Sequence, residues 1–245
     1  MTWLRLLRSD WLKTKRTPLR LAIFAAPVGY ALLLLWYFSS FRVTPELPLQ
    51  LYRAFFEGWT VFLPLAAGSI TGLLCLLEEQ AGRFGAVLGL PTSRILIYAN
   101  KLLLLIVITA GSVLLSVTIL IFGLRYGLRI ETMNASLFYE GALLAISGSL
   151  SLLALHLWLS FAFGLGAGVG VGAAGLLTAA IIGATHVGDP FWQVVPWAWP
   201  VRLAMHPLDP VVLADRLPPA LLLFAVLAVI GSVWFHQWEG RKLEE

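Results

Sequence analysis

The stretch that decides the fold reads EEQAGRFGAVLGLPTSRILIYANK and covers residues 78–101. Apolar runs flank it on both sides, and each run is long enough to cross a membrane, which takes about 20 apolar residues. Charged residues are scarce elsewhere in the chain, so this stretch is the largest polar surface on its side of the membrane. We interpret it as a docking element for another protein.

The pattern within this stretch predicts a short amphipathic helix. Glu78 and Glu79 suit the positive, N-terminal end of a helix dipole. Pro91 ends the helix because proline cannot continue it, and Thr92 or Ser93 can cap the next one. Such a helix can press its apolar side against a soluble partner or lie at the lipid headgroups, and the periodicity favours neither. The apolar stripe consists of Ala81, Phe84, Val87 and Leu88.

The same stretch resembles the cytoplasmic coupling helix of ATP-binding-cassette (ABC) permeases of the type-2 exporter class. Two acidic residues are followed by a glycine, a short apolar helix, the sequence LPTSR at residues 90–94 and then Lys101. The resemblance extends over nearly the whole chain and is closest to the small permeases of lantibiotic-immunity transporters. It implies a membrane subunit that couples to a separate cytoplasmic ABC ATPase and hydrolyses no ATP itself. The ATPase-coupling residues that it implies are Glu78, Glu79, Gly82, Arg83, Phe84, Val87, Leu88, Pro91 and Arg94.

The composition excludes a soluble protein. Of the 245 residues, 59% are hydrophobic and only 12% are charged, whereas about a quarter of the residues are charged in soluble domains. The net charge of +4 gives no reason to expect a nucleic-acid partner. The single cysteine, Cys75, cannot form a disulfide within the chain, and the four histidines are not spaced as metal ligands. We therefore expect neither a metal nor a cofactor, and no nucleotide-binding or hydrolase motif occurs in the sequence.

Hydropathy predicts an all-α integral membrane protein in which residues 21–245 form one six-helix transmembrane domain. Residues 1–20 interleave basic and apolar residues at helical spacing, which predicts an amphipathic helix at the membrane interface. A secretory signal is the alternative for this start, but the apolar run that follows is long enough to span. The predicted spans are residues 21–40, 58–77, 102–124, 137–160, 164–185 and 219–238.

The placement of lysine and arginine predicts the orientation of these spans. Eleven of the 17 basic residues lie in the two terminal segments and in the 78–101 stretch, and six lie in the connections on the other side. Cytoplasmic segments carry the excess of basic residues in membrane proteins. We therefore expect both termini and the 78–101 stretch in the cytoplasm, in a multi-pass protein of the cell membrane.

The fifth span contains the glycine-rich run GLGAGVGVGAAG at residues 164–175. Gly164, Gly168 and Gly172 repeat at four-residue spacing, so one helix face is nearly bare backbone and lets another helix approach closely. We favour packing within the chain over a subunit interface. Hydroxyl groups at helical spacing on the third and fourth spans are expected to bond across helices, namely those of Thr109, Ser112, Ser116, Ser147 and Ser151.

Residues 186–218 precede the last span and are rich in proline and tryptophan. They contain too many prolines for one helix, and Trp192, Trp197 and Trp199 suit the outer membrane interface. In the family that the chain resembles, the corresponding segment dips back into the bilayer. The resemblance therefore implies a short re-entrant outer segment before the last helix.

Glu57, Glu140 and His156 are the polar residues placed closest to the hydrocarbon. Ionisable groups within spans usually face the bundle interior or a water-filled path, which makes these three candidates for a translocation path. For the two glutamates, a position at the membrane interface is the alternative.

Together these features predict the permease subunit of an ATP-driven exporter that acts in the lipid bilayer as a homodimer or heterodimer of six-span units. The resemblance implies a hydrophobic or amphipathic peptide antibiotic as the cargo. An exporter for a lipid, glycan, ion or drug is one alternative. An intramembrane enzyme that uses Glu140 and His156, or a membrane scaffold without transport activity, are the others.

Overall fold

The computed structural model describes residues 3–15, 17–42, 44–82, 84–130, 133–207 and 209–241. In these ranges the chain is helical and contains no strand, and six helices are long and apolar enough to cross a membrane. The predicted fold class is thereby confirmed. The membrane-length helices are α2 (Pro18–Ser39), α3 (Leu47–Gln80), α5 (Arg94–Phe122), α6 (Ala135–Phe163), α7 (Leu165–Thr178) and α9 (Pro210–Gln237), of which α5 and α7 continue into the π-helical turns Gly123–Gly127 and Ala179–Gly183. The shorter helices are α1 (Trp3–Lys13), α4 (Gly85–Leu88) and α8 (Trp199–Met205).

Several helices extend beyond the predicted spans, and α3 does so most. It begins at Leu47 and ends at Gln80, whereas hydropathy placed the second span at residues 58–77. Pro48 lies in the first turn of α3, where a backbone N–H has no helical partner, so proline starts this helix without cost. The hydropathy bounds mark the hydrocarbon segment, and the helix continues past it on both sides.

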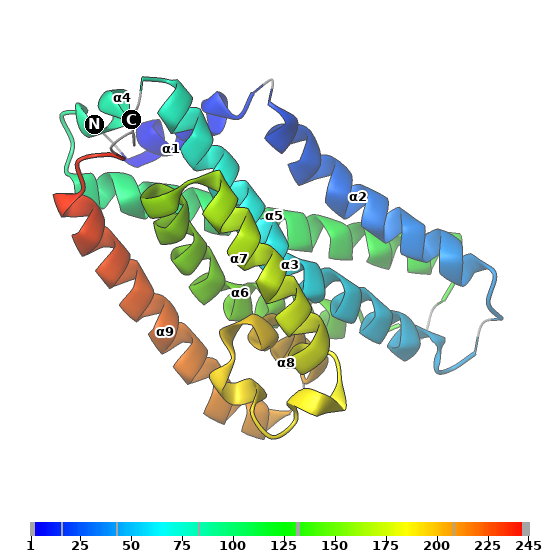
Figure 1. Ribbon diagram of the computed structural model, residues 1–245. Helices are drawn as coiled ribbons and strands as arrows, with labels where there is room; N and C mark the ends of the chain where they lie inside the picture. The colour runs from blue at the N-terminus through cyan, green and yellow to red at the C-terminus, as the bar shows by residue number, and fades with distance from the viewer. Residues whose placement is uncertain are drawn as a thin grey trace.

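The centre of the bundle is formed by α3 and α6. α3 packs most extensively against α7 and then against α6, and α6 also contacts α5, α8 and α9. α2 lies along one edge, where it packs mainly on α5 and touches α3 at few positions (Figure 1). α1, α4 and the last turn of α9 gather at one end of the bundle, which we call the terminal end, whereas α8 lies at the other end of α9.

Two of the three predicted packing glycines face α3. A Cβ atom on Gly172 would lie 2.9 Å from the carbonyl oxygen of Pro64, and one on Gly68 would overlap the carbonyl oxygen of Gly168. The backbones of α3 and α7 are therefore in direct contact. Gly164 has a different place, because it forms the turn between α6 and α7 with a φ of 92°. A side chain there would be strained and would also collide with Arg241.

Hydroxyl groups of α5 hold α2 at the edge of the bundle. Ser116 Oγ donates to the carbonyl oxygen of Pro27 at 3.0 Å, and Ser112 Oγ donates to that of Ile23 at 3.3 Å, as their spacing predicts. Ser147 instead donates within α6 to Leu143 O at 2.8 Å. α2 is also bonded to α3, because Tyr30 Oη donates to the carbonyl oxygens of Phe55 at 2.9 Å and Ala54 at 3.2 Å.

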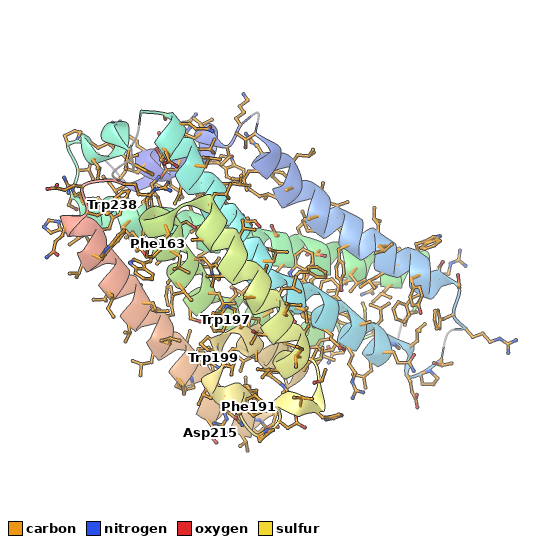
Figure 2. All side chains as sticks on the ribbon, viewed as in Figure 1. Phe163, Phe191, Trp197, Trp199, Asp215 and Trp238 are labelled. Atoms are coloured by element: carbon orange, nitrogen blue, oxygen red, sulfur yellow. The ribbon has the colours of Figure 1, made fainter. Side chains whose placement is uncertain are left out.

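The segment between α7 and α9 folds back onto the bundle. Three single turns of 3-10 helix lead into α8, which packs on α6 and α3. Trp192 and Trp199 are buried, and Trp197 is half-buried beside Gly175, so these rings fill space within the chain. Their predicted place at the outer membrane interface stays a prediction. Figure 2 shows Trp199, the first residue of α8, at the end of the bundle remote from Trp238. Entry of this segment into the bilayer stays a prediction.

Arg202 of α8 ties this outer segment to the end of α7. Its guanidinium donates to the carbonyl oxygens of Ile182 at 3.0 Å and Thr185 at 2.7 Å, and to Asp189 Oδ1 at 2.7 Å. The hydrogen bond from Arg202, followed by one from His186, holds the pKa of the Asp189 carboxyl below its ordinary value.

Candidate functional site

The 78–101 stretch begins at the end of a long helix. Glu78 and Glu79 lie in the last turn of α3, which corrects the prediction that they start a short helix. The apolar run of α3 continues to Leu77, and the helix is not interrupted before Gly82, whose φ of 118° is left-handed. Carboxylates are unfavourable at the negative end of a helix dipole, so cations from other elements must offset them.

Glu78 is held by a buried cluster of charges from three helices. Its Oε1 atom accepts from Lys101 Nζ of α5 at 2.5 Å and from Lys13 Nζ of α1 at 2.7 Å. Asp10 Oδ1 lies 3.2 Å from Lys13 Nζ and 3.6 Å from Lys101 Nζ, and Asn100 donates to Asp10 Oδ2 at 3.0 Å. The side chains of Glu78 and Lys101 are only 4% and 6% exposed, so this cluster fastens α1 to the core.

Lys13 is the more accessible cation of this cluster. Burial opposes its charge, but the hydrogen bond and the charge of Glu78, together with Asp10, outweigh that cost and raise the pKa of Lys13 above its ordinary value. Its ammonium group therefore stays protonated at neutral pH. Asp10 and Lys13 were not predicted as site residues, because the basic character of residues 1–20 indicated a membrane surface and gave no sign of a carboxylate partner.

Glu79 points to a different partner from its neighbour. Its Oε2 atom accepts from Arg241 Nη2 at 2.6 Å, and Arg241 follows the end of α9. The two adjacent glutamates thus connect α3 to opposite ends of the chain.

The predicted amphipathic helix is a single turn whose apolar side faces inward. α4 covers Gly85–Leu88, and Phe84 precedes it with a left-handed φ of 65°. Phe84 and Val87 are each 2% exposed, and the ring of Phe84 packs against Trp238 at 4.9 Å and Phe161 at 6.0 Å. These two residues therefore anchor the segment in the bundle, where the sequence suggested a surface for a partner.

The described residues that are exposed in segment 81–93, which we call the coupling segment, are small. Ala81, Gly82, Gly85 and Gly89 are exposed, as are Pro91 and Ser93, whereas Leu88 is half-buried. Arg83 lies outside the described residues. The coupling role of the predicted residues stays a prediction.

The end of the coupling segment is capped and fastened. Ser93 Oγ accepts from Leu96 N at 3.3 Å and caps α5, as predicted. Arg94 Nη1 donates to the carbonyl oxygens of Trp238 at 2.8 Å and His236 at 3.3 Å, which are free acceptors at the C-terminal end of α9.

The structure does not bring the three candidate path residues together. Glu57 is exposed on α3, Glu140 is half-buried on α6, and His156 is fully buried on α6. Glu140 and His156 are sixteen residues apart on one helix, which separates them by about 24 Å. His156 Nδ1 lies 2.8 Å from Leu152 O, and its Nε2 atom has no hydrogen-bond partner in the described part of the chain. Their role in a path stays a prediction.

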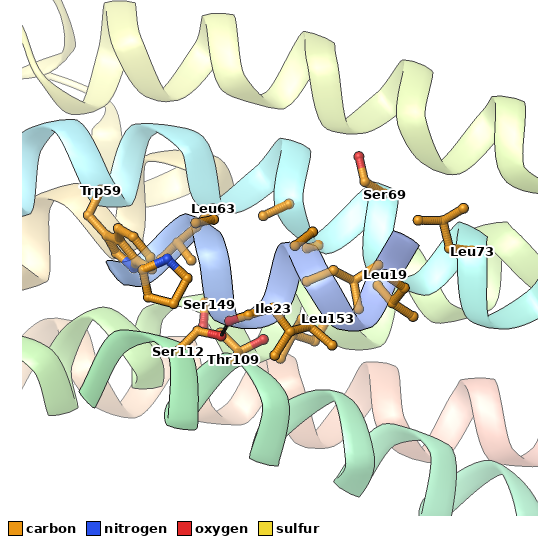
Figure 3. Close-up of a pocket in the computed structure, with 16 residues that line it drawn as sticks. Leu19, Ile23, Trp59, Leu63, Ser69, Leu73, Thr109, Ser112, Ser149 and Leu153 are labelled. Carbon is orange, nitrogen blue, oxygen red and sulfur yellow. Dashed lines mark hydrogen bonds between the residues drawn. The ribbon is translucent and has the colours of Figure 1, made fainter. Parts of the chain in front are cut away.

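An apolar groove that the sequence analysis missed lies between α2 and α3. It has a volume of about 210 Å³, and α5 and α6 form its floor. Figure 3 shows Trp59 and Leu63 of α3 along one wall, with the hydroxyl groups of the floor among apolar side chains. A second hollow of about 420 Å³ shares Trp59 and Leu63 with it and extends the groove along the two helices.

Small side chains open this groove. Ala22 and Ala26 line it from α2, and Ala66 and Ala67 line it from α3. Alanines four residues apart on a first span are the sequence signal for such a space, but they equally fit two helices in close contact. Which of the two applies depends on the separation of α2 and α3, which only the tertiary structure gives.

The described chain thus forms a bundle of six membrane-length helices, with one polar connection anchored by ion pairs and an apolar groove at its edge. A sequence profile of the ABC-2 family transporter proteins matches residues 6–183, and the chain belongs to this family. Comparisons with curated proteins and with solved structures gave no match.

Family membership makes the chain a membrane-spanning permease of an ABC transporter. It implies an ABC ATPase as partner, and the membrane component of such a transporter is typically not the catalytic one. The matched residues include the whole coupling segment and the groove, but not the outer segment or α9.

Proposed function

We propose that the chain is the permease subunit of an ATP-driven exporter, that it works as a homodimer or heterodimer, and that its coupling segment docks on a cytoplasmic ABC ATPase. The observation that carries this proposal is the construction of the segment. Its apolar side chains are anchored in the bundle, while small residues form its outer surface. A partner that presses on a segment anchored in this way moves helices and not only a loop.

The charges at the terminal end support a cytoplasmic location. Arg5, Arg8 and Lys15 are exposed on or just after α1, and Asp10, the acidic residue of α1, faces the buried cluster around Glu78. The exposed surface of α1 is therefore basic. Basic surfaces next to spans favour the cytoplasmic side, where the ATPase is also found.

The groove supports a hydrophobic or amphipathic cargo. Its walls are apolar, and the few polar groups are hydroxyls such as those of Ser69 and Ser149. The resemblance to lantibiotic-immunity permeases favours a peptide antibiotic that is removed from the membrane. Glu57, Glu140 and His156 lie outside the groove, so this cargo proposal does not depend on them.

Docking is tested by cysteine cross-linking in native membranes with the partner ABC ATPase. We expect Ala81→Cys to cross-link to the ATPase in a nucleotide-sensitive manner, because Ala81 is exposed on the coupling segment. The native Cys75 is buried and contributes no background. Phe84→Cys and Tyr126→Cys are the controls, since Phe84 is buried and Tyr126 lies near the opposite end of α5. If Ala81→Cys stays unlinked in a correctly inserted protein, the docking proposal is wrong and the enzyme or scaffold alternatives gain weight.

Cargo use of the groove is tested by filling it. Ala66→Trp places a large ring where α2 and α3 are separated, and we expect export of a fluorescently labelled lantibiotic to fall at least tenfold while ATPase binding is retained. The matched control is Ala173→Trp, because Ala173 is exposed on α7 away from the groove. Export that survives Ala66→Trp would contradict the groove as the cargo site. An assay in which the unmodified transporter moves no lantibiotic, but moves a labelled lipid or drug, would support the alternative cargo.

A further inference from the structure

We propose that Arg241 is a positioning residue that couples the segment 81–93 to α9, so that the two move as one body. The inference rests on the proposed function for its consequence in transport, but its geometry stands without it. Arg241 lies in the short tail after α9, which the sequence analysis described only as charged and cytoplasmic.

Arg241 contacts three elements at once. Its guanidinium donates to Glu79 Oε2 at the end of α3, and its central carbon lies 5.3 Å from the centre of the Phe84 ring. The same group packs against Gly164 in the turn between α6 and α7, where any side chain would occupy its place. The side chain of Arg241 is only 22% exposed, so it is packed against the protein and is not a solvated charge of the tail.

The residues that flank the coupling segment are both attached to the end of α9 and the tail that follows it. At the start, Glu79 binds Arg241, and at the finish, Arg94 binds the carbonyl oxygens of His236 and Trp238. Both attachments end within residues 236–241. A loop whose two ends are fixed to the same short piece of chain cannot shift without carrying that piece along.

An aromatic cluster completes the attachment in the middle of the segment. The ring of Trp238 lies 4.9 Å from Phe84, 5.4 Å from Phe161 and 5.4 Å from Phe235, which joins α4, α6 and α9. Figure 2 shows Trp238 at the terminal end of the bundle, where α9 ends. The cation of Arg241 over Phe84 adds to this packing, since a cation above an aromatic face is attracted to it.

α9 lies at the outside of the bundle, and its apolar window is only 11% buried within the chain, against 61% for α6. It packs along α6 and α5 on one side. The contacts of Arg241 and Arg94 add a polar attachment at its C-terminal end. The Glu78 cluster has a different task, because it fastens α1 and α5 and includes no residue of α9.

The first test measures the distance between spin labels on Gly85→Cys in α4 and Val233→Cys in α9, two exposed positions, in the full-length protein. We expect a narrow distance distribution that becomes at least twofold wider with Arg241→Ala. Arg241→Lys and the charge exchange Glu79→Arg with Arg241→Glu should restore the narrow distribution. Lys13→Ala is the matched control, because it disturbs the neighbouring cluster and should leave the width unchanged. An unchanged width in Arg241→Ala overturns the proposal.

The second test uses the complex with the ATPase in proteoliposomes and a labelled lantibiotic as the probe. Arg241→Ala should keep ATP hydrolysis but lower the amount of peptide exported per ATP at least tenfold, and Arg241→Lys should recover most of it. A purely structural role would lower the amount of folded protein without changing this ratio. If the unmodified complex exports no lantibiotic, the proposed cargo is wrong, and the spin-label result still decides whether Arg241 positions the segment.

Discussion

Replacing Lys101 by methionine is expected to lower the free energy of unfolding by about 3–5 kcal/mol, because it leaves the carboxylate of Glu78 buried without its closest cation. Glu78 Oε1 and Lys101 Nζ are 2.5 Å apart, and both side chains are almost completely buried. Methionine has an unbranched apolar side chain like the stem of lysine and lacks only the terminal ammonium group, so the change removes the charge and little of the packing. The measurement is thermal and denaturant unfolding of the purified protein in one detergent, followed by the fluorescence of its tryptophans.

Two further variants separate the ion pair from the packing. Lys13→Met removes the second cation on Glu78, but the side chain of Lys13 is 38% exposed, so we expect a loss of at most about 1 kcal/mol. Glu78→Leu combined with Lys101→Met removes both charges and should recover most of the stability lost in the single variant. Equal losses for Lys13→Met and Lys101→Met, or no recovery in the double variant, would show that the cluster does not hold Glu78 as described.

The six spans were predictable from the sequence, because each apolar run is long enough to cross the hydrocarbon and a helix satisfies all of its backbone hydrogen bonds there. Their exact ends were not, since α3 gains more than three turns outside the hydrophobic run through Pro48 and the polar residues after it. Helix ends depend on caps and on partners in other elements. For Glu78 and Glu79 those partners come from α1, α5 and the tail after α9, which no local pattern connects to them.

The sequence predicted where in the chain the candidate site lies, but not which of its side chains face the bundle and which face outward. Periodicity identified Phe84 and Val87 as one apolar face, but a period states which residues share a face and not what that face meets. The structure turns this face toward Phe161 and Trp238, because the left-handed backbone at Phe84 reverses the chain onto the bundle. The contacts of Arg241 could not be predicted for a related reason. A charged tail is usually solvated, and only the tertiary structure places Arg241 against Gly164.

Gly68→Ala is expected to destabilise the protein by about 1–3 kcal/mol, because it inserts a methyl group where two backbones touch. The added Cβ atom would overlap the carbonyl oxygen of Gly168 and lie 3.1 Å from the ring of His156. A carbonyl group of a helix cannot rotate away, so α3 and α7 must separate and lose their contact along its whole length. The loss is measured by the same unfolding experiment.

Gly170→Ala provides the matched control on the glycine-rich helix itself. A Cβ atom on Gly170 would meet nothing within 4 Å, and alanine is favoured over glycine inside a helix by about 1 kcal/mol. The two variants make the same chemical change and should shift the unfolding midpoint in opposite directions. An upward shift in both variants would mean that these glycines act only through helix propensity. Opposite shifts would establish that the close approach of α3 and α7 constrains the fold. This helix pair then forms the rigid base that carries Glu78, Glu79 and the coupling segment at the end of α3.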